Sequence, residues 1–431
     1  MKILNNPSKK DWKKEIARPV FKTKEIQKLV KPIMRKVKRQ GDKALQKFAF
    51  EYDHVEITEL LVSRQEIVEA KENVSTELKQ AIQLALENIK KFHEAQQTPD
   101  LKMEIMEGVS CMRRSVPIQR VGLYVPGGTA PLFSTVLMLG VPANIAGCEE
   151  IVLCTPPNKE GQIHPAILYT ADLIGIDKIV KAGGAQAIAA MTFGTESVPQ
   201  VDKIFGPGNQ YVTAAKQLAT KKGVAIDLPA GPSEVLVYAD ETAVPAFVAA
   251  DLLSQAEHGV DSQVILVANS EKVAKAAIME VDKQLEKLPR KAIAEKALEN
   301  SVAVVMPNPD KALELINEYA PEHLILVVEN SDEVAYKVRN AGSVFIGNFT
   351  PESAGDYASG TNHTLPTYGY AKNYSGVSLD SFVKKITYQK LSEEGIKNLG
   401  PTIEVMAGAE LLEAHKNAVT LRLQYLNGEQ S

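Results

Sequence analysis

The feature that most constrains the fold of this chain is a repeated alternation of short apolar runs and helical segments. From about Val116 the runs RVGLYV, EIVLCT, KIVKA and KIF are each followed by a stretch whose apolar residues recur at helical spacing. A second series contains SQVILVAN, SVAVVMP, HLILVVEN and SVFIGN, again separated by helical stretches. Parallel strands need a crossover connection, usually a helix, so this rhythm is typical of βαβ units. The sequence therefore predicts an α/β fold with two Rossmann-like parallel-sheet domains.

The alternation also sets the predicted domain boundaries. An inserted second domain would span residues 123–234, and the first α/β domain would combine residues 23–122 with residues 235–370. The start of the first domain is predicted to be helical, because TELKQAIQLALENIKKFHEA carries apolar residues at helical spacing. Residues 1–22 are predicted as an N-terminal helical segment. Residues 371–431, where the alternation stops, are predicted as a helical arm whose stretch GAELLEAHKNAVTLRLQYL is one long helix.

Composition excludes several classes of partner. The chain has 431 residues, 45% of them hydrophobic, which is enough for about three domains with sizeable cores. A net charge of -4 gives no electrostatic reason to expect nucleic acid or an anionic membrane as a partner. Three cysteines without a CxxC pair are too few for a disulfide scaffold. The N-terminus has no apolar signal core and Pro142 interrupts the longest apolar run, so we expect a cytoplasmic protein without a membrane span.

Glycine turns follow the predicted strands of the first series. In an open parallel sheet, ligands bind at the carboxyl ends of the strands, and glycine lets backbone amides approach a ligand closely. A nucleotide cleft is therefore expected at these turns, although such glycines also serve helix–strand packing. The fingerprint GxGxxG is absent, because Tyr211 takes the place of the third glycine in GPGNQY, so a dinucleotide would bind by another geometry. The turns contain Gly127 and Gly128, Gly183 and Gly184, Gly206 and Gly208, and Gly231.

Side chains that can bind a metal gather in the second series. In LLSQAEHGVDSQ, Gln255 and His258 stand three residues apart near the predicted end of a helix, which puts them on one face. Asp356 follows in a glycine-rich loop and His415 in the last helix. Amide and carboxylate oxygens and imidazole nitrogens are usable ligands for zinc and similar ions. These four residues are a plausible catalytic or substrate-binding metal site, although Gln-x-x-His spacing alone is weak support and a lone helical histidine is more often a surface residue.

Glu322 and His323, in APEHLIL, are the best acid–base candidates. Histidine titrates near neutrality, and an adjacent carboxylate could share the proton transfer. The alternative is a loop pair that only caps or hydrogen-bonds the backbone. Glu410 and His415 are five residues apart, about 140° around an ideal helix, so they could flank one site without lying in one row.

Long motifs of the chain resemble one known family. The segments YVPGGTAPLFSTVLMLGVPANIAGC, IDLPAGPSEVLVYAD, LLSQAEHGVDSQ, YAPEHL and GNFTPESAGDYASGTNHTLPT resemble histidinol dehydrogenase, in the order of that family and from about Phe21 to the last helix. The resemblance implies an NAD-dependent oxidoreductase acting on the CH–OH group. Such an enzyme oxidises L-histidinol to L-histidine through L-histidinal with two NAD⁺, in the last steps of histidine biosynthesis. It also implies one Zn²⁺ per subunit and a homodimer with intertwined C-terminal arms.

The resemblance further implies roles for individual residues. His323 would be the general base that takes the hydroxyl proton, and Glu322 would activate the water that hydrates the aldehyde. The zinc ligands would be Gln255, His258, Asp356 and, from the partner chain, His415. The substrate would contact these ligands together with Ser233, His323 and, again from the partner chain, Glu410. NAD would contact three residues near the glycine turns, Tyr124, Gln186 and Asn209.

Three other functions compete with this interpretation. A cysteine-dependent aldehyde dehydrogenase would need a thiolate nucleophile, for which Cys148 and Cys154 are the candidates, although Cys154 in the run EIVLCT is better explained as a packing thiol. A periplasmic-type binding protein would also have two α/β lobes but would not use NAD. A related dehydrogenase would act on another amino alcohol or a sulfonated diol, whereas Glu410 and His415 favour a histidinol-type substrate.

Overall fold

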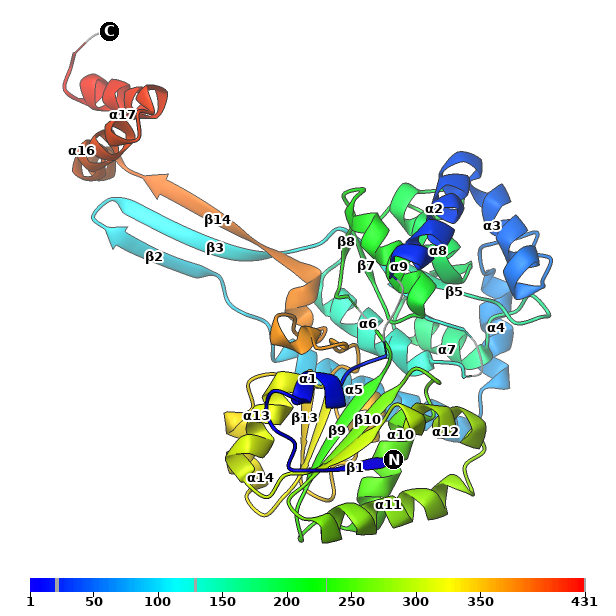
Figure 1. The fold of residues 1–431 in the computed structure, drawn as a ribbon. Helices are drawn as coiled ribbons and strands as arrows, with labels where there is room; N and C mark the ends of the chain where they lie inside the picture. Colours follow the sequence, from blue (N-terminus) through cyan, green and yellow to red (C-terminus); the bar gives the residue numbers. More distant parts are fainter. Residues whose placement is uncertain (20–22, 128–129, 230, 430–431) are drawn as a thin grey trace. The chain divides into compact units, whose positions relative to one another are not determined.

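The chain forms two compact units. The first comprises Met1–Gln96 and Ile118–Phe382 and holds two parallel sheets (Figure 1), which confirms the predicted α/β class with two Rossmann-like sheets. The second comprises Gln97–Pro117 and Val383–Ser431 and holds one antiparallel sheet and two helices. No helix among the described residues is both long and apolar enough to cross a membrane. This computed structural model describes residues 1–19, 23–127, 130–229 and 231–429.

One sheet of the first unit has six strands, all parallel. Its order is β1-β11-β10-β9-β12-β13, so the strands other than β1 follow the doubly wound order of a Rossmann-like fold. β9, β10 and β12 are buried along their whole length, which explains their uninterrupted apolar sequences. The strands are β1 (Lys2–Asn5), β9 (Glu234–Ala239), β10 (Gln263–Ala268), β11 (Val302–Val305), β12 (His323–Val327) and β13 (Ser343–Ile346).

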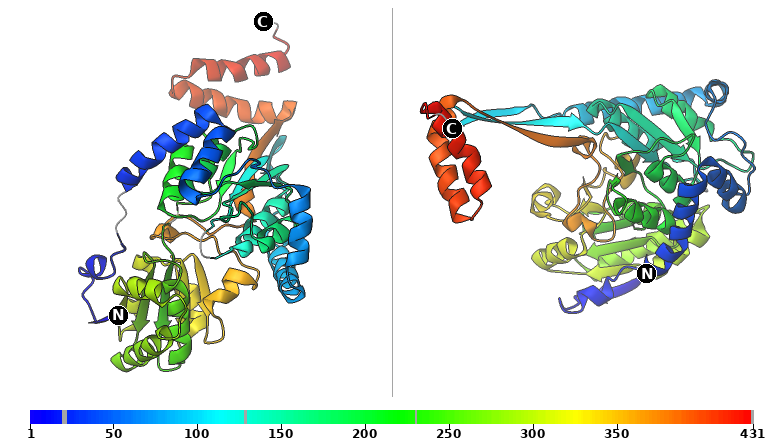
Figure 2. Two further views of the ribbon diagram at one scale, coloured as in Figure 1. Left: turned by 90° about the vertical axis from the view of Figure 1, so that its right-hand side faces the viewer. Right: turned by 90° about the horizontal axis from the view of Figure 1, so that it is seen from above.

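Helices cover both faces of the six-stranded sheet (Figures 1 and 2). Side chains alternate between the two faces of a strand. Val235 and Val237 of β9 therefore pack with α10, α11 and α12, whereas Leu236 and Tyr238 pack with α1 and α13. The helices are α1 (Trp12–Glu15), α10 (Pro245–Ala256), α11 (Glu271–Leu285), α12 (Lys291–Glu299) and α13 (Pro309–Tyr319).

The other sheet of the first unit has five parallel strands in the order β6-β5-β4-β7-β8, again doubly wound. α2, α8 and α9 cover one face and α6 and α7 the other. The strands are β4 (Arg120–Tyr124), β5 (Glu150–Thr155), β6 (Lys178–Lys181), β7 (Lys203–Phe205) and β8 (Ala225–Ile226). The helices are α2 (Thr23–Gln40), α6 (Phe133–Ala146), α7 (Pro165–Leu173), α8 (Gly184–Phe193) and α9 (Gln210–Thr220).

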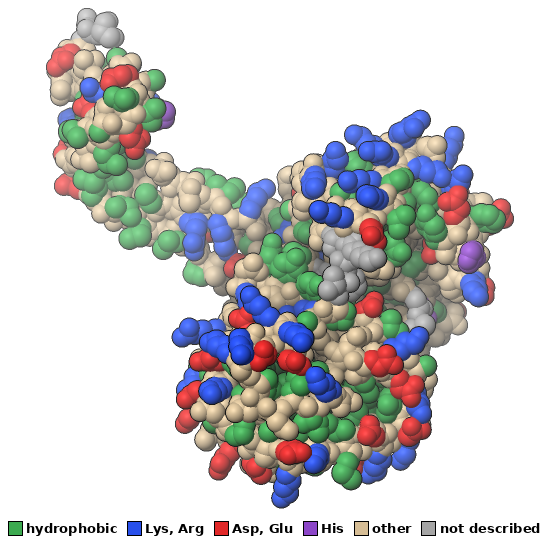
Figure 3. Space-filling model, in the orientation of Figure 1, with side chains coloured by type: hydrophobic (Ala, Val, Ile, Leu, Met, Phe, Trp, Pro, Cys, Tyr) green, Lys and Arg blue, Asp and Glu red, His purple; other side chains and the backbone are tan. Residues whose placement is uncertain are grey.

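α2 shows how the sequence pattern becomes packing. Ile26, Val30, Met34 and Val37 recur at helical spacing and are all buried in the core that α2 forms with α8 and α9. The opposite face carries lysines and arginines, and Figure 3 shows blue side chains gathered over this part of the first unit. The lysines and arginines of α2 therefore form a solvated helix face.

Two predicted boundaries in the N-terminal third are wrong. The helices before residue 96 pack mainly on the helices of the five-stranded sheet: α2 contacts α8 and α9, α4 (Arg64–Asn73) contacts α7, and α5 (Thr76–Glu94) contacts α6. Their contact with residues 235–370 is smaller and includes a 2.9 Å hydrogen bond from Asn88 of α5 to the carbonyl of Ala358. The N-terminal segment is not wholly helical either, because β1 pairs with β11 and extends the six-stranded sheet. An exposed edge strand accepts such a neighbour through backbone hydrogen bonds that leave no apolar pattern in the sequence.

The second unit is also not wholly helical. β3 pairs with β2 and with β14 in an antiparallel sheet, so residues 97–117 belong with the C-terminal segment. α16 and α17 pack on each other and are separated by a break at Leu411, whose φ of 60° is left-handed, so the one long helix predicted here is two. The elements are β2 (Leu101–Met106), β3 (Val109–Pro117), β14 (Val383–Leu391), α16 (Glu393–Ala409) and α17 (Glu413–Leu426).

Candidate active site

The glycine turn after β7 lies at the topological switch point of the five-stranded sheet, between β4 and β7. Gly206 has a φ of 126°, and the carbonyl of Tyr124 occupies the position that its Cβ would take. Only glycine fits this close approach of the two strand ends. This turn therefore lies at the carboxyl end of the sheet, where open α/β sheets bind ligands.

A buried ion pair fixes the backbone of this turn. Nζ of Lys216, on α9, lies 2.5 Å from Oδ1 of Asp227 and donates a 2.8 Å hydrogen bond to the carbonyl of Gly206. The other oxygen of Asp227 accepts a 2.7 Å hydrogen bond from the backbone N–H of Gly206. Both backbone groups of Gly206 are thus fixed by buried charges. The sequence did not reveal this pair, because one lysine in a helix and one aspartate in a loop form no distinctive pattern.

The three residues expected to contact NAD lie around these turns. Tyr124 ends β4, and its hydroxyl accepts a 3.0 Å hydrogen bond from the N–H of Gly184, at the start of α8. Gln186 is buried in the first turn of α8. Asn209 caps α9, because its Oδ1 accepts hydrogen bonds from two backbone N–H groups of the first turn, which leaves the side-chain NH₂ as its remaining polar group. Gly128 lies outside the described residues, and so does Phe21, at which the family resemblance begins.

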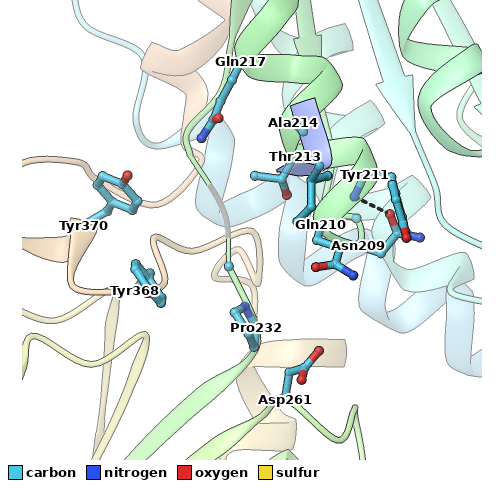
Figure 4. A pocket seen from close by; sticks show the side chains of 13 residues that line it. Asn209, Gln210, Tyr211, Thr213, Ala214, Gln217, Pro232, Asp261, Tyr368 and Tyr370 are labelled. Carbon is cyan, nitrogen blue, oxygen red and sulfur yellow. Dashed lines mark hydrogen bonds between the residues drawn. The ribbon is translucent and has the colours of Figure 1, made fainter. Parts of the chain in front are cut away.

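A pocket of about 250 Å³ extends from the start of α9 (Figure 4). Asn209 and Tyr211 line one side and Tyr368 and Tyr370 another, so the walls carry aromatic rings as well as amides. Such a wall offers flat apolar surface with a few polar groups, which suits a nucleotide.

A second cavity, of about 350 Å³, joins this turn to the six-stranded sheet. Gly208 and Asn209 line it on one side, and Ser233, His258 and Glu322 line it on the other. Ser233 and Glu322 directly precede β9 and β12, so the six-stranded sheet contributes the amino ends of its strands. The rule that ligands meet the carboxyl ends therefore describes only the five-stranded sheet here.

His323, the first residue of β12, lies at the centre of a buried polar cluster. Its Nδ1 lies 3.2 Å from the carbonyl oxygen of Glu234 and 3.7 Å from Oε2 of Glu322. Its Nε2 lies 3.5 Å from Oδ1 of Asp356 and has no hydrogen-bond partner among the described residues. The carboxylate of Glu322 is anchored separately, because its Oε2 accepts a 2.8 Å hydrogen bond from the backbone N–H of Glu234. A buried imidazole with a free nitrogen can accept a proton from a bound substrate.

Glu234 in turn is tied to the N-terminal segment. Arg18 donates two hydrogen bonds to its carboxylate, at 2.5 and 2.8 Å, and a third, at 2.7 Å, to the carbonyl of Tyr319. Its guanidinium also lies 3.9 Å from the centre of the Tyr319 ring. Residues far apart in the sequence thereby hold the start of β9 beside Glu322.

Three of the four expected metal ligands come together near His323. Gln255 is buried at the end of α10, and His258 follows two residues after the helix ends, exposed to solvent. Asp356 lies on α15 (Glu352–Tyr357). His258, Asp356 and Glu352 can bring one ligand atom each within 4.8 Å of one another, so Glu352 joins a cluster in which the sequence reasoning had not placed it.

The electrostatics of the cluster favour a bound cation. Burial raises the pKa of Glu322 and of Glu352 to about 8. Burial lowers the pKa of His323, but the charge of Glu322 and the groups of Asp356 and Glu352 outweigh it and raise the pKa to about 10. Three carboxyl groups lie around the imidazole of His323. A cation bound beside them would offset their charge and lower the pKa of His323, which would leave the imidazole neutral and able to accept a proton.

Glu410 and His415 lie on the second unit. Glu410 caps the C-terminal end of α16 and His415 lies in the first turn of α17, and both side chains are exposed. The break at Leu411 separates them, so the angle expected for one continuous helix does not apply.

The cysteines are poorly placed for covalent catalysis. Cys154 is fully buried in β5 among the apolar residues of a core cluster, and burial raises the pKa of its thiol to about 12. Burial also raises the pKa of Cys148 to about 12, and its Sγ faces the carbonyl of Phe382 at 3.9 Å. A thiol with such a pKa is almost wholly protonated near neutral pH and is a weak nucleophile.

Comparisons with known proteins agree with this arrangement. The family model described as histidinol dehydrogenase matches residues 16–423. A histidinol dehydrogenase of Bacteroides thetaiotaomicron is 61% identical over 426 residues, 99% of this chain and 100% of the relative, and one of Haemophilus influenzae is 53% identical over 99% of both chains. The crystal structure of histidinol dehydrogenase from Elizabethkingia anophelis has a TM-score of 0.97 and 58% identity, and the match covers 99% of each chain.

A betaine aldehyde dehydrogenase of Staphylococcus aureus, at 12% identity and a TM-score of 0.50, shares only the fold. The matches to the family model and to the Bacteroides relative, by contrast, span almost the whole sequence. This protein therefore belongs to the histidinol dehydrogenase family.

Proposed function

We propose that the chain carries out two successive NAD-dependent oxidations at one zinc-containing site, converting L-histidinol to L-histidine through L-histidinal. Its family is one of NAD-dependent oxidoreductases that act on a CH–OH group and serve histidine biosynthesis. The observation that carries the proposal is the single cavity of about 350 Å³ bounded by the glycine turn of one sheet and by Glu322 and His258 of the other. A hydride donor and its acceptor can meet there.

His323 and Glu322 divide the proton transfers. In the first step the free Nε2 of His323 takes the hydroxyl proton while hydride leaves the carbinol carbon for NAD⁺, giving the aldehyde and NADH. In the second step Glu322 removes a proton from water, which adds to the aldehyde carbon. The resulting hydrate loses a second hydride to a second NAD⁺ and its remaining hydroxyl proton to His323, which gives the carboxylate. Both side chains are buried, so bulk water does not compete with the substrate for their protons.

The buried donors near His323 fit zinc. Oε1 of Gln255 is buried and has no hydrogen-bond partner among the described residues, and such an orphaned oxygen needs a ligand. Gln255, His258 and Asp356 would hold the ion together with His415 of the partner subunit, an N/O set without thiolate that suits a catalytic zinc. Bound zinc would supply a Lewis acid that anchors the amine and imidazole nitrogens of histidinol. Ser233 would contact the substrate from the same cavity.

The five-stranded sheet would bind NAD. Tyr124, Gln186 and the NH₂ group of Asn209 lie at the carboxyl ends of its strands or at the helix starts that follow them. The pair Lys216–Asp227 would keep the turn at Gly206 in the position that these contacts need.

A homodimer would complete the site. Glu410 and His415 are exposed on a unit whose strands and helices leave large apolar side chains uncovered, a pattern that marks interaction surfaces. In the proposed dimer the arm of one subunit brings these two residues to the substrate of the other. The uncovered apolar residues are Leu101, Met103, Ile105, Met106, Tyr388, Val405, Met406, Leu411, Leu412, Leu421 and Tyr425.

Removal of the metal tests the zinc proposal. We expect a chelator to abolish NADH formation from histidinol and added Zn²⁺ to restore it, with zinc content followed by elemental analysis. A sample in which the chelator is saturated with zinc beforehand controls for inhibition by the chelator itself. Full turnover in protein from which zinc has been removed would contradict the proposal.

A further inference from the structure

We propose that Glu352 is a positioning residue, which orients the amide of Gln255 so that its oxygen rather than its nitrogen faces the zinc ion. The inference rests on the zinc site proposed above. It gives a role to a buried carboxylate that neither the acid–base chemistry nor the proposed ligand set uses.

The hydrogen bonds of Glu352 define the orientation. Nε2 of Gln255 donates to Oε1 of Glu352, and the hydroxyl of Ser254 donates to Oε2 at 3.2 Å. Glu352 is 1% exposed and Gln255 also 1% exposed, so water does not compete for these bonds. With its nitrogen engaged, Gln255 presents Oε1, which is buried and without a partner among the described residues.

An amide needs such a partner because its two ends have nearly the same shape. Only the oxygen has a lone pair for a metal, whereas the NH₂ group can only donate. A carboxylate accepts hydrogen bonds and therefore selects the orientation in which NH₂ points toward it. Groups that orient metal ligands in this way typically contribute roughly 10–100-fold to metal affinity.

Direct ligation by Glu352 is the competing role. Its carboxylate can come within 4.8 Å of potential ligand atoms of His258 and Asp356, so proximity alone does not separate the two roles. The substitution Glu352→Gln separates the two roles. Glutamine keeps an oxygen that accepts the hydrogen bond from Gln255, but it lacks the negative charge that a ligating carboxylate would contribute.

The test measures zinc affinity of the full-length protein by competition with a chromophoric chelator. We expect Glu352→Met, which keeps the length but not the acceptor, to weaken zinc binding roughly 10–100-fold. Glu352→Gln should stay within about threefold of wild type. Glu257→Gln, which removes a charge beside His258 without touching the Gln255–Glu352 bond, is the matched control and should also stay within about threefold. Thermal unfolding of the metal-free variants checks that each is folded.

A double-mutant cycle tests whether Glu352 acts through Gln255. In a Gln255→Ala background, Glu352→Met should cause no further loss of zinc affinity, because its target is gone. Additive losses, or a Glu352→Gln variant as weak as Glu352→Met, would overturn the positioning role, and so would unchanged affinity in Glu352→Met. If Glu352→Met does not fold, Glu352→Gln still decides, since a tenfold loss there contradicts the inference. A wild-type protein that binds no zinc would instead refute the zinc site itself.

Discussion

At the scale of single residues, the carboxylates of the site differ in the groups that hydrogen-bond to them. Glu322 is fixed by the backbone of Glu234, whereas Glu352 is fixed by Gln255 and Ser254. The adjacency of Glu322 and His323 was visible in the sequence. Glu352 was overlooked although it stands four residues before Asp356, on the same helix face, because this spacing is common on exposed helices and burial is not written in it.

Replacement of His323 tests the proposed base. His323→Asn should lower turnover by roughly 10²–10⁴, the range for loss of general acid–base catalysis, with little change in fold. The matched control is His164→Asn, because His164 caps α7 through a 3.2 Å hydrogen bond that asparagine can replace. Its turnover should equal that of wild type. Near-normal steady-state turnover in His323→Asn would remove His323 from the mechanism.

At the scale of elements, uninterrupted apolar runs predicted the buried strands because both faces of a parallel sheet are covered. β2 was missed because all its residues are exposed, so burial imposes no alternation on its sequence. The break at Leu411 was missed because it contains neither glycine nor proline, the residues that usually signal the end of a helix. Strands that depend only on backbone pairing, and turns formed by ordinary residues, therefore stay hidden from pattern analysis.

The buried pair under the glycine turn yields a prediction about stability. Lys216→Met leaves Asp227 buried without its cation and should lower the free energy of unfolding by about 3–5 kcal/mol. It should also raise the KM for NAD, because Gly206 loses a hydrogen bond. Lys275→Met, in an exposed helical pair with Glu271, should cost only about 0.3–0.5 kcal/mol. Denaturant unfolding measures both, and equal losses would show that burial of the pair contributes nothing.

At the scale of the whole molecule, the account requires residues of two subunits in each site. Mixing His323→Asn with His415→Asn subunits should restore up to about a quarter of wild-type turnover, because half of the sites in each heterodimer are intact. Mixing His323→Asn with Gln255→Ala subunits should restore none, because each site then keeps one lesion. Absence of recovery despite demonstrated subunit exchange would place His415 outside the partner's site.

The central claim is that one site carries out both oxidations. The most direct measurement is the amount of NADH formed when a limiting amount of L-histidinol is consumed completely by zinc-loaded protein with excess NAD⁺. The account predicts two NADH and one L-histidine for each L-histidinol, with no accumulation of free aldehyde. One NADH per substrate with the aldehyde released, or no NADH at all, would contradict it.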